Sequence, residues 1–265
     1  MPKAKVNGIN ISYGVQGKGE PLVLISGYSS DQSGWIFQTG AFKKYYRVIT
    51  FDNRGVGKTD KPGGAYSMKT MADDTVGLMD HLGIKKAHIL GISSGGLIAQ
   101  ALAINHPERI NKLVLASTDS GGGGLSPAWL KALGLREDAT DDDLRGVPIV
   151  KRGDAVYPLA FNRPLLRIVF TFFARIKARL SGTAGLHGQW EAFFGYNTLN
   201  DLPKVEVPTL VLAGAQDRLI KPSSSEVIAK LMPNARLVKV EGASHAFNVE
   251  MRGRFNKEVL DFLRA

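Results

Sequence analysis

The chain has 265 residues, 44% of them hydrophobic, which is enough to bury the core of one large domain and argues against a disordered chain. It contains no cysteine, which excludes disulfide bonds, thiol nucleophiles and zinc sites built on thiolates. The formal net charge is +10, but Lys and Arg are not interleaved with aromatic residues, so we expect a solvated basic surface and no nucleic-acid partner.

Six short, nearly continuous hydrophobic segments predict strands that are buried on both faces, as in a parallel sheet. In chain order they are LVLIS at 22–26, RVITFD at 47–52, AHILGIS at 87–93, KLVLAST at 112–118, PTLVLAG at 208–214 and ARLVKVEG at 235–242. Helix-like segments alternate with them, at Met68–Leu82, Gly95–His106, Ser223–Leu231 and Arg254–Leu263. We therefore predict an α/β fold with a mostly parallel, doubly wound sheet.

The alternation stops after Thr118 and does not resume until Pro208. We expect a core of residues 1–120 and 203–265, with a helical lid inserted at 121–202. Within this lid, 164–180 is an amphipathic segment whose apolar face we expect to pack on a core. That face consists of Leu165, Ile168, Val169, Phe172, Ile176 and Leu180. A basic helix lying on a membrane surface would show the same pattern.

No segment predicts export or membrane insertion. The N-terminal MPKAKVNGINISYG lacks the apolar segment of a secretory signal. The longest apolar runs, such as Ile168–Ala174, are far shorter than the ~20 residues of a membrane span. We expect a soluble cytoplasmic protein without stable membrane insertion, and no pattern indicates its oligomeric state.

The pentapeptide Gly91-Ile92-Ser93-Ser94-Gly95 joins a predicted strand directly to a predicted helix. This context is what makes the Gly-x-Ser-x-Gly pattern informative. Such a turn forces the serine into an unfavourable backbone conformation and exposes its hydroxyl near the positive end of the helix. Because a hydroxyl becomes a good nucleophile when a base takes its proton, Ser93 also requires a histidine.

Of the five histidines, His245 is the predicted base, because it follows a strand and a flexible Gly-Ala-Ser segment near the C-terminus. The other four lie in predicted strands and helices or in the insertion. A carboxylate must orient the imidazole and stabilise its positive charge. Asp217, just beyond the strand at 208–214, is the favoured acid, and Asp119, just beyond 112–118, is the alternative. Ser93, Asp217 and His245 follow the chain order expected on an α/β sheet.

These motifs, together with LVLISGYSS, FDNRGVGKTDKP, VPTLVLAGAQDRLI and GASHAFNVE, resemble the α/β-hydrolase superfamily over nearly the whole chain. The group most similar to it comprises small esterases, 3-oxoadipate enol-lactonases and cofactor-free haloperoxidases. The resemblance implies an oxyanion hole made by the backbone N–H groups of Tyr28 and Ser94. Ser26 stands where the family usually has histidine, so the hydrogen bonds that shape this loop are expected to differ. FDNRGVGKTDKP lacks P-loop spacing and is expected to be a structural turn in which Asp52 and Arg54 pair.

The resemblance implies a carboxylesterase-like serine hydrolase that uses no metal or cofactor and cleaves small, apolar esters through an acyl-enzyme on Ser93. Lactone opening, carbon–carbon bond hydrolysis and perhydrolysis use the same three side chains and stay open. A ligand-perceiving receptor of this fold with slow turnover is an alternative of another class. Aromatic residues of the lid indicate apolar acyl or aryl groups: Phe170, Phe172, Phe173, Trp190, Phe193 and Phe194. Arg163, Arg167 and Arg175 indicate a carboxylated substrate such as an enol-lactone.

Overall fold

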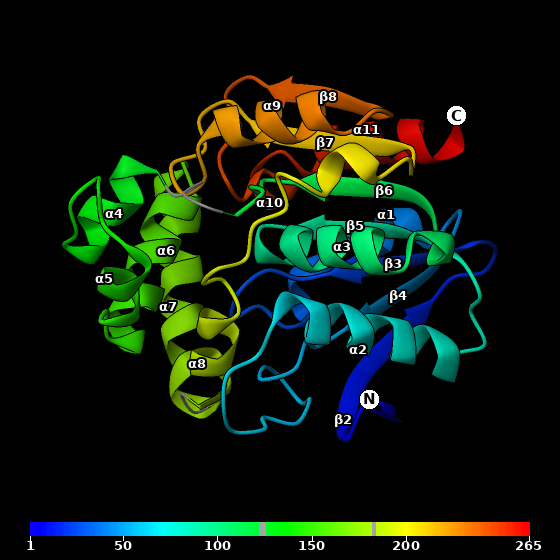
Figure 1. The fold of residues 1–265 in the computed structure, drawn as a ribbon, viewed down its shortest axis with the longest axis horizontal. Helices are drawn as coiled ribbons and strands as arrows, with labels where there is room; N and C mark the ends of the chain where they lie inside the picture. Colours follow the sequence, from blue (N-terminus) through cyan, green and yellow to red (C-terminus); the bar gives the residue numbers. More distant parts are fainter. Residues whose placement is uncertain (122–125, 182–183) are drawn as a thin grey trace.

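The computed structural model describes residues 1–121, 126–181 and 184–265, with the backbone alone described at 149–150, 153–154 and 173–181. One sheet has the strand order β1-β2-β4-β3-β5-β6-β7-β8 (Figure 1). Its strands are β1 (Lys3–Val6), β2 (Ile9–Gln16), β3 (Pro21–Ile25), β4 (Arg47–Phe51), β5 (Ala87–Ile92), β6 (Ile110–Ala116), β7 (Thr209–Gly214) and β8 (Ala235–Val240). From β4 to β8 neighbouring strands are parallel, whereas β1 and β2 pair antiparallel. The prediction of a mostly parallel α/β sheet is confirmed.

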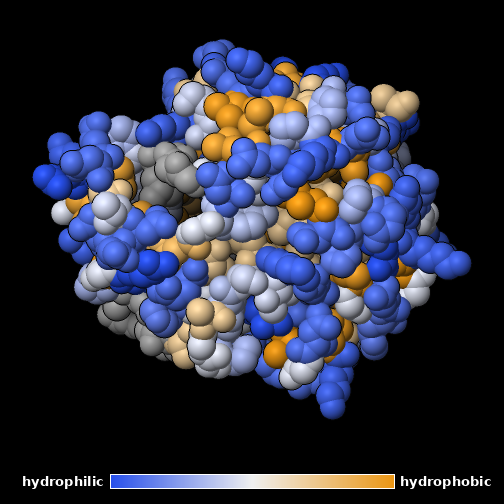
Figure 2. Space-filling view, viewed as in Figure 1, coloured by the Kyte–Doolittle hydropathy of each residue, from blue (hydrophilic) through white to orange (hydrophobic). Residues whose placement is uncertain are grey.

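Helices cover both faces of the sheet, and each face has its own apolar core (Figure 1). One face carries α2 (Met68–His81), α3 (Ser94–Asn105) and α9 (Pro222–Leu231). The other carries α1 (Ile36–Phe42), α10 (Phe247–Glu250) and α11 (Arg252–Arg264). Short 3-10 turns lie at Gln32–Trp35, Pro107–Arg109 and Leu202–Lys204. The outer surface of the α2–α3–α9 face is mostly hydrophilic, with small separate apolar groups (Figure 2).

Two features of the sheet differ from the sequence prediction. The first is the β1–β2 hairpin, which was not predicted although Asn7 and Gly8 form its turn with φ of 47° and 81°. Asn-Gly between alternating apolar residues is a strong hairpin signal. The second is β8, which was predicted to be buried on both faces but is an edge strand with Arg236 and Lys239 exposed. Charged residues on such an edge discourage pairing with another chain.

Five helices occur among the described residues between β6 and β7, and they lie beside the carboxyl ends of the parallel strands (Figure 1). They are α4 (Pro127–Leu133), α5 (Asp141–Arg145), α6 (Ile149–Ala160), α7 (Pro164–Ser181) and α8 (Ala184–Glu191). These inserted helices share a third apolar core, which contains Trp129, Leu133, Phe161 and Trp190. It also includes Leu219 from the loop after β7, so the insertion packs directly on the sheet's edge.

The expected orientation of α7 is wrong. Leu165, Ile168 and Val169 are 71%, 65% and 38% exposed, and Phe172 is also exposed. The predicted positions Ile176 and Leu180 lie outside the described side chains. Instead, Phe170 faces inward and stacks on Phe161 with ring centroids 4.8 Å apart. Apolar residues occupy two faces of this helix, so periodicity alone did not identify the buried one. Among the described residues, no helix is both long enough and apolar enough to cross a membrane.

Candidate active site

Ser93 lies at the junction of β5 and α3 in a strained conformation, with φ 55° and ψ −128°. A positive φ is uncommon for a residue with a side chain, and it persists only where the surrounding packing enforces it. Its N–H donates to the Ala116 carbonyl at the end of β6, at 2.9 Å, which fixes the turn. The predicted strand-to-helix turn is therefore present.

The two glycines of the pentapeptide are required by close packing. A Cβ at Gly95 would collide with the carbonyl oxygens of Ile25 and Ser26, the last residue of β3 and the one after it. A Cβ at Gly91 would collide with the Gly95 carbonyl and lie 2.9 Å from the Ala99 Cβ. Because α3 approaches the sheet this closely, its N-terminus is held against the loop that follows β3.

His245 and Asp217 meet at the carboxyl end of the sheet. Asp217 follows β7, His245 follows β8, and Nδ1 of the imidazole lies 2.8 Å from Oδ2 of the carboxylate. The other carboxylate oxygen accepts the backbone N–H groups of Leu219 and Ile220 at 2.8 and 3.0 Å. Both side chains are largely buried, so their interaction is poorly screened by water. The Ser117 hydroxyl donates to the His245 carbonyl at 3.0 Å and anchors the loop.

Asp119, the alternative acid, occupies a different position. Its carboxylate accepts the Gly121 N–H at 3.2 Å and makes no hydrogen bond to His245 among the described residues. Burial is the main cause that raises the pKa of this carboxyl above its usual range. The structure thus brings Asp217, rather than Asp119, into contact with the imidazole.

The loop after β3 lies beside Ser93. A Cβ at Gly27 would lie 3.1 Å from the Ser93 Cβ, so the two segments touch. The backbone N–H groups of Tyr28 and Ser94 donate to none of the described residues. This is expected for Ser94, which begins the first turn of α3. Burial raises the pKa of the Tyr28 hydroxyl to about 12, so this phenol stays neutral.

One cavity of about 330 Å³ lies between the sheet edge and the inserted helices. The predicted site residues that line it are Ser93, Ser94, Tyr28, Asp119 and His245. No hydrogen bond joins the Ser93 hydroxyl to the imidazole among these described side chains. Such contacts commonly tighten only when substrate binds. The aromatic wall of the cavity consists of Trp129, Phe161, Phe170, Trp190, Phe193 and Phe194. No group of three or more acidic or histidine side chains suited to a metal occurs in the described part of the chain.

A family model described as the alpha/beta hydrolase fold matches residues 20–250. The chain belongs to the α/β-hydrolase family. This match confirms the resemblance drawn from the sequence motifs.

Individual relatives of this α/β hydrolase carry several activities in their names. The Acinetobacter baylyi protein named 3-oxoadipate enol-lactonase 2 is 30% identical over 240 residues, which are 90% of this chain and 86% of that protein. The Azorhizobium caulinodans protein named as a carbamate hydrolase, RutD, is 26% identical over 264 residues, or 99% and 98% of the two chains. The crystal structure of the enol-lactonase from Burkholderia xenovorans LB400 gives a TM-score of 0.87 at 31% identity, with 100% of both chains covered.

Ser26, the position that sequence analysis singled out in this loop, is buried. Its carbonyl accepts the Asn53 side-chain amide at 2.9 Å, and its hydroxyl lies 3.5 Å from the Asp31 carbonyl. The Asp52 carboxylate accepts the N–H groups of Gln32 and Lys58 at 2.9 and 2.8 Å. The loop of this α/β hydrolase is therefore held by the side chains of Asp52 and Asn53, which directly follow β4.

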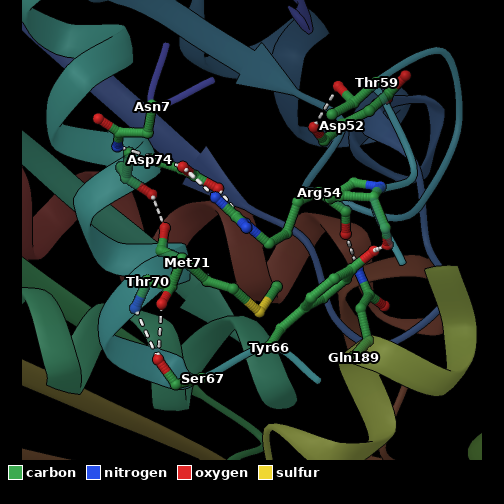
Figure 3. Close-up of polar contacts among 12 residues, drawn as sticks. Asn7, Asp52, Arg54, Thr59, Tyr66, Ser67, Thr70, Met71, Asp74 and Gln189 are labelled. Atoms are coloured by element: carbon green, nitrogen blue, oxygen red, sulfur yellow. Dashed lines mark hydrogen bonds and ion pairs between the residues drawn. The ribbon is translucent and has the colours of Figure 1, made fainter. Parts of the chain in front are cut away.

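The expected Asp52–Arg54 pair is wrong. Arg54 instead forms a bidentate ion pair with Asp74 on α2, with N–O distances of 2.5 and 2.7 Å (Figure 3). The Asp52 carboxylate is instead occupied by the backbone N–H groups of Gln32 and Lys58. FDNRGVGKTDKP does form a turn after β4, as predicted, but without the expected Asp52–Arg54 pair.

The cavity does not present the arginines expected from the sequence. Arg163 and Arg167 do not line it, and Arg175, like Phe173, lies outside the described side chains. Among the described residues that line the cavity, Lys221 is the one basic side chain besides His245, and it is accompanied by Glu137 and Asp141. The charge of this wall therefore does not favour an anionic substrate.

Proposed function

We propose that this α/β hydrolase is a serine hydrolase that cleaves small, neutral, largely apolar carboxylic esters. The observation that carries this proposal is the convergence on one cavity of a strained serine and a buried imidazole that contacts a carboxylate, the 2.8 Å pair of His245 and Asp217. Nucleophile, base and orienting acid are the three groups that acyl transfer requires.

In the proposed mechanism, His245 removes the proton from the Ser93 hydroxyl as its oxygen attacks the ester carbonyl. Asp217 keeps the imidazole in the tautomer that accepts this proton and stabilises the resulting positive charge. The Tyr28 and Ser94 N–H groups receive the oxyanion. His245 then protonates the leaving alcohol, and water hydrolyses the acyl-enzyme to regenerate Ser93.

The cavity supports a substrate with apolar groups. Its aromatic wall offers van der Waals contact to acyl or aryl groups, and its volume of about 330 Å³ lies at the small end of ligand pockets. Glu137 and Asp141 on the wall would repel a carboxylate. These properties favour neutral esters over dicarboxylic derivatives.

We also propose that residues 121–202 form a lid over a core of residues 1–120 and 203–265. The insertion supplies all the residues of the aromatic wall defined above, whereas the core supplies Ser93 and His245. The Ala246 N–H donates to the Ala160 carbonyl of α6 at 2.9 Å, which ties the loop after His245 to the insertion. A lid of this kind excludes water and shapes the pocket.

Hydrolysis of p-nitrophenyl esters from acetate to decanoate tests the proposal. The wild type is expected to turn over many times, with a chain-length optimum that reports the size of the cavity. Ser93→Ala is expected to reduce the rate to background, while Ser223→Ala, at an exposed serine of α9, is expected to retain it. Equal rates for wild type and Ser93→Ala would contradict the proposal.

Lactone opening is the second candidate, and it rests on the similarity to the two enol-lactonases. The same three side chains open a lactone, because the leaving alcohol stays attached to the acyl group. A kcat/KM for neutral lactones above that for matched open-chain esters would favour it. A single burst of product followed by almost no turnover would instead favour a ligand-perceiving receptor.

A further inference from the structure

The loop that would hold the oxyanion, after β3, also contains a strained residue. Ser29 has φ 59°, a backbone conformation that favours glycine, although this residue carries a side chain. Its strain persists only if contacts outside the loop fix it. The Ser29 N–H belongs to the peptide group that follows Tyr28, and the Tyr28 N–H belongs to the one before it, so a contact that fixes the Ser29 N–H restrains the Tyr28 backbone from its C-terminal side.

Gln189 on α8 holds that peptide group. The Ser29 N–H donates to Gln189 Oε1 at 3.1 Å, and Gln189 Nε2 donates to the Arg54 carbonyl at 2.9 Å. The side chain is 3% exposed, so water does not compete for either bond. The two bonds need one acceptor and one donor at the end of the same side chain, which a primary amide provides.

The α8 helix is itself fixed against the core. Gly185 packs so closely on Gly55 that a Cβ on either residue would collide with the other's backbone. The Tyr66 N–H donates to the Gly188 carbonyl at 3.2 Å, and the Tyr66 ring covers Gly188. Gln189 therefore starts from a helix that cannot shift without breaking these contacts.

The acceptor of the second bond is equally well held. Arg54 points its guanidinium at Asp74 on α2, and the Tyr66 ring lies below it at 5.4 Å (Figure 3). Asn7 adds a bond to Asp74 at 3.3 Å. Figure 3 shows the Arg54 carbonyl turned away from this ion pair and toward Gln189.

We propose that Gln189 is a positioning residue of the inserted helices, which orients the Tyr28 N–H of the oxyanion hole through Ser29. This inference rests on the proposed function, because it assigns a role only if an oxyanion forms beside Ser93. Tyr157 on α6 supports the same loop, since its hydroxyl lies 3.2 Å from the Ser29 hydroxyl. The oxyanion hole is then completed by the insertion rather than by the sheet alone.

Gln189→Met tests the proposal, because methionine keeps the length of the side chain and removes both hydrogen bonds. Since the oxyanion exists only in the transition state, kcat is expected to fall about 10–100-fold while KM changes less than about 3-fold. The Kd of a boronic acid that bonds to Ser93 is expected to rise in parallel with the loss of kcat/KM.

Gln189→Glu gives a readout that a purely structural role would not change. An ionised carboxylate accepts from Ser29 but repels the Arg54 carbonyl, whereas the protonated acid restores the missing donor. The ratio of its kcat to that of the wild type at the same pH is therefore expected to rise as pH falls. A ratio independent of pH would overturn the proposal.

Gln38→Met is the control, since Gln38 is also buried and its side chain also makes two hydrogen bonds, donating to the Asn248 carbonyl and to Asn256 Oδ1 at 2.7 and 3.1 Å. It lies on α1, on the sheet face that carries α10 and α11, and makes no hydrogen bond to Ser29 among the described residues, so a fall in Tm without the loss of kcat is expected. Equal kcat losses in the two Met variants, or a Gln189→Met kcat within about twofold of wild type, would overturn the role of Gln189 alone. Absence of Ser93-dependent hydrolysis in the wild type would overturn the proposed function and this inference together.

Discussion

The carboxylate of Asp217 divides its two oxygens between two partners. Oδ2 contacts the imidazole of His245, while Oδ1 accepts two backbone N–H groups of the loop that follows. The backbone bonds hold the carboxylate still, so the imidazole is oriented by a fixed group rather than by a mobile side chain. Asp119 is anchored to Gly121 and points elsewhere.

Asp217→Asn is expected to lower kcat on a p-nitrophenyl ester by about 10³–10⁴-fold, because the amide favours the wrong imidazole tautomer. Asp119→Asn, the matched carboxamide change in the same cavity, is expected to keep kcat within about tenfold of wild type. Steady-state kinetics of the two variants check this. A larger loss for Asp119→Asn than for Asp217→Asn would assign the orienting acid to Asp119.

The buried carboxyl of Asp119 predicts a pH dependence of stability. Burial raises its pKa in the folded state, so folded protein keeps the proton at a pH where the unfolded chain has lost it. The stability from this group is present below the ordinary carboxyl pKa of about 4 and is lost as pH rises through the raised value. The Tm of Asp119→Asn relative to wild type is therefore expected to increase from about pH 4 towards neutrality. Thermal denaturation across this range checks it, and a constant difference would contradict it.

At the scale of elements, the strands that carry the site were predictable because buried parallel strands are nearly continuous apolar segments. The apolar segments of β5 and β7 therefore indicate the positions of Ser93 and Asp217 from the sequence alone. Gln189 was not predictable, since nothing in the local sequence HGQWE indicates contact with a loop 160 residues away. The predicted orientation of α7 was wrong for a related reason. Which face of this helix is buried depends on where α6 lies and not on the spacing of apolar residues within α7.

Two substitutions in the insertion test its packing. Leu133→Ala removes a side chain that is 1% exposed in the insertion's core and is expected to cost about 2–5 kcal/mol of unfolding free energy. Ile168→Ser, on the exposed face of α7, is expected to change it by less than about 0.5 kcal/mol. Urea denaturation measures both. A cost at Ile168 comparable to that at Leu133 would show that this face is covered.

At the scale of the whole molecule, the cavity is formed jointly by the sheet edge and the inserted helices. A ligand bound there contacts both parts and is expected to raise the free energy of unfolding of the whole protein. A boronic acid bound through Ser93 at 100 times its Kd is expected to add about 2.7 kcal/mol, or roughly 5–10 °C in Tm. Differential scanning calorimetry checks this, with Ser93→Ala expected to show a much smaller shift. A shift equally large in that variant would place the ligand elsewhere.

The pairing of β6 with β7 has a further consequence. β6 ends at Ala116 and β7 begins at Thr209, yet the two strands are direct neighbours in the sheet. The entropy lost on closing such a loop grows only with the logarithm of its length, so doubling the segment between them would cost about 0.6 kcal/mol. The frame that carries Ser93, Asp217 and His245 can therefore accept insertions of very different size. New pockets can arise by exchange of this one segment while the reacting groups stay in place.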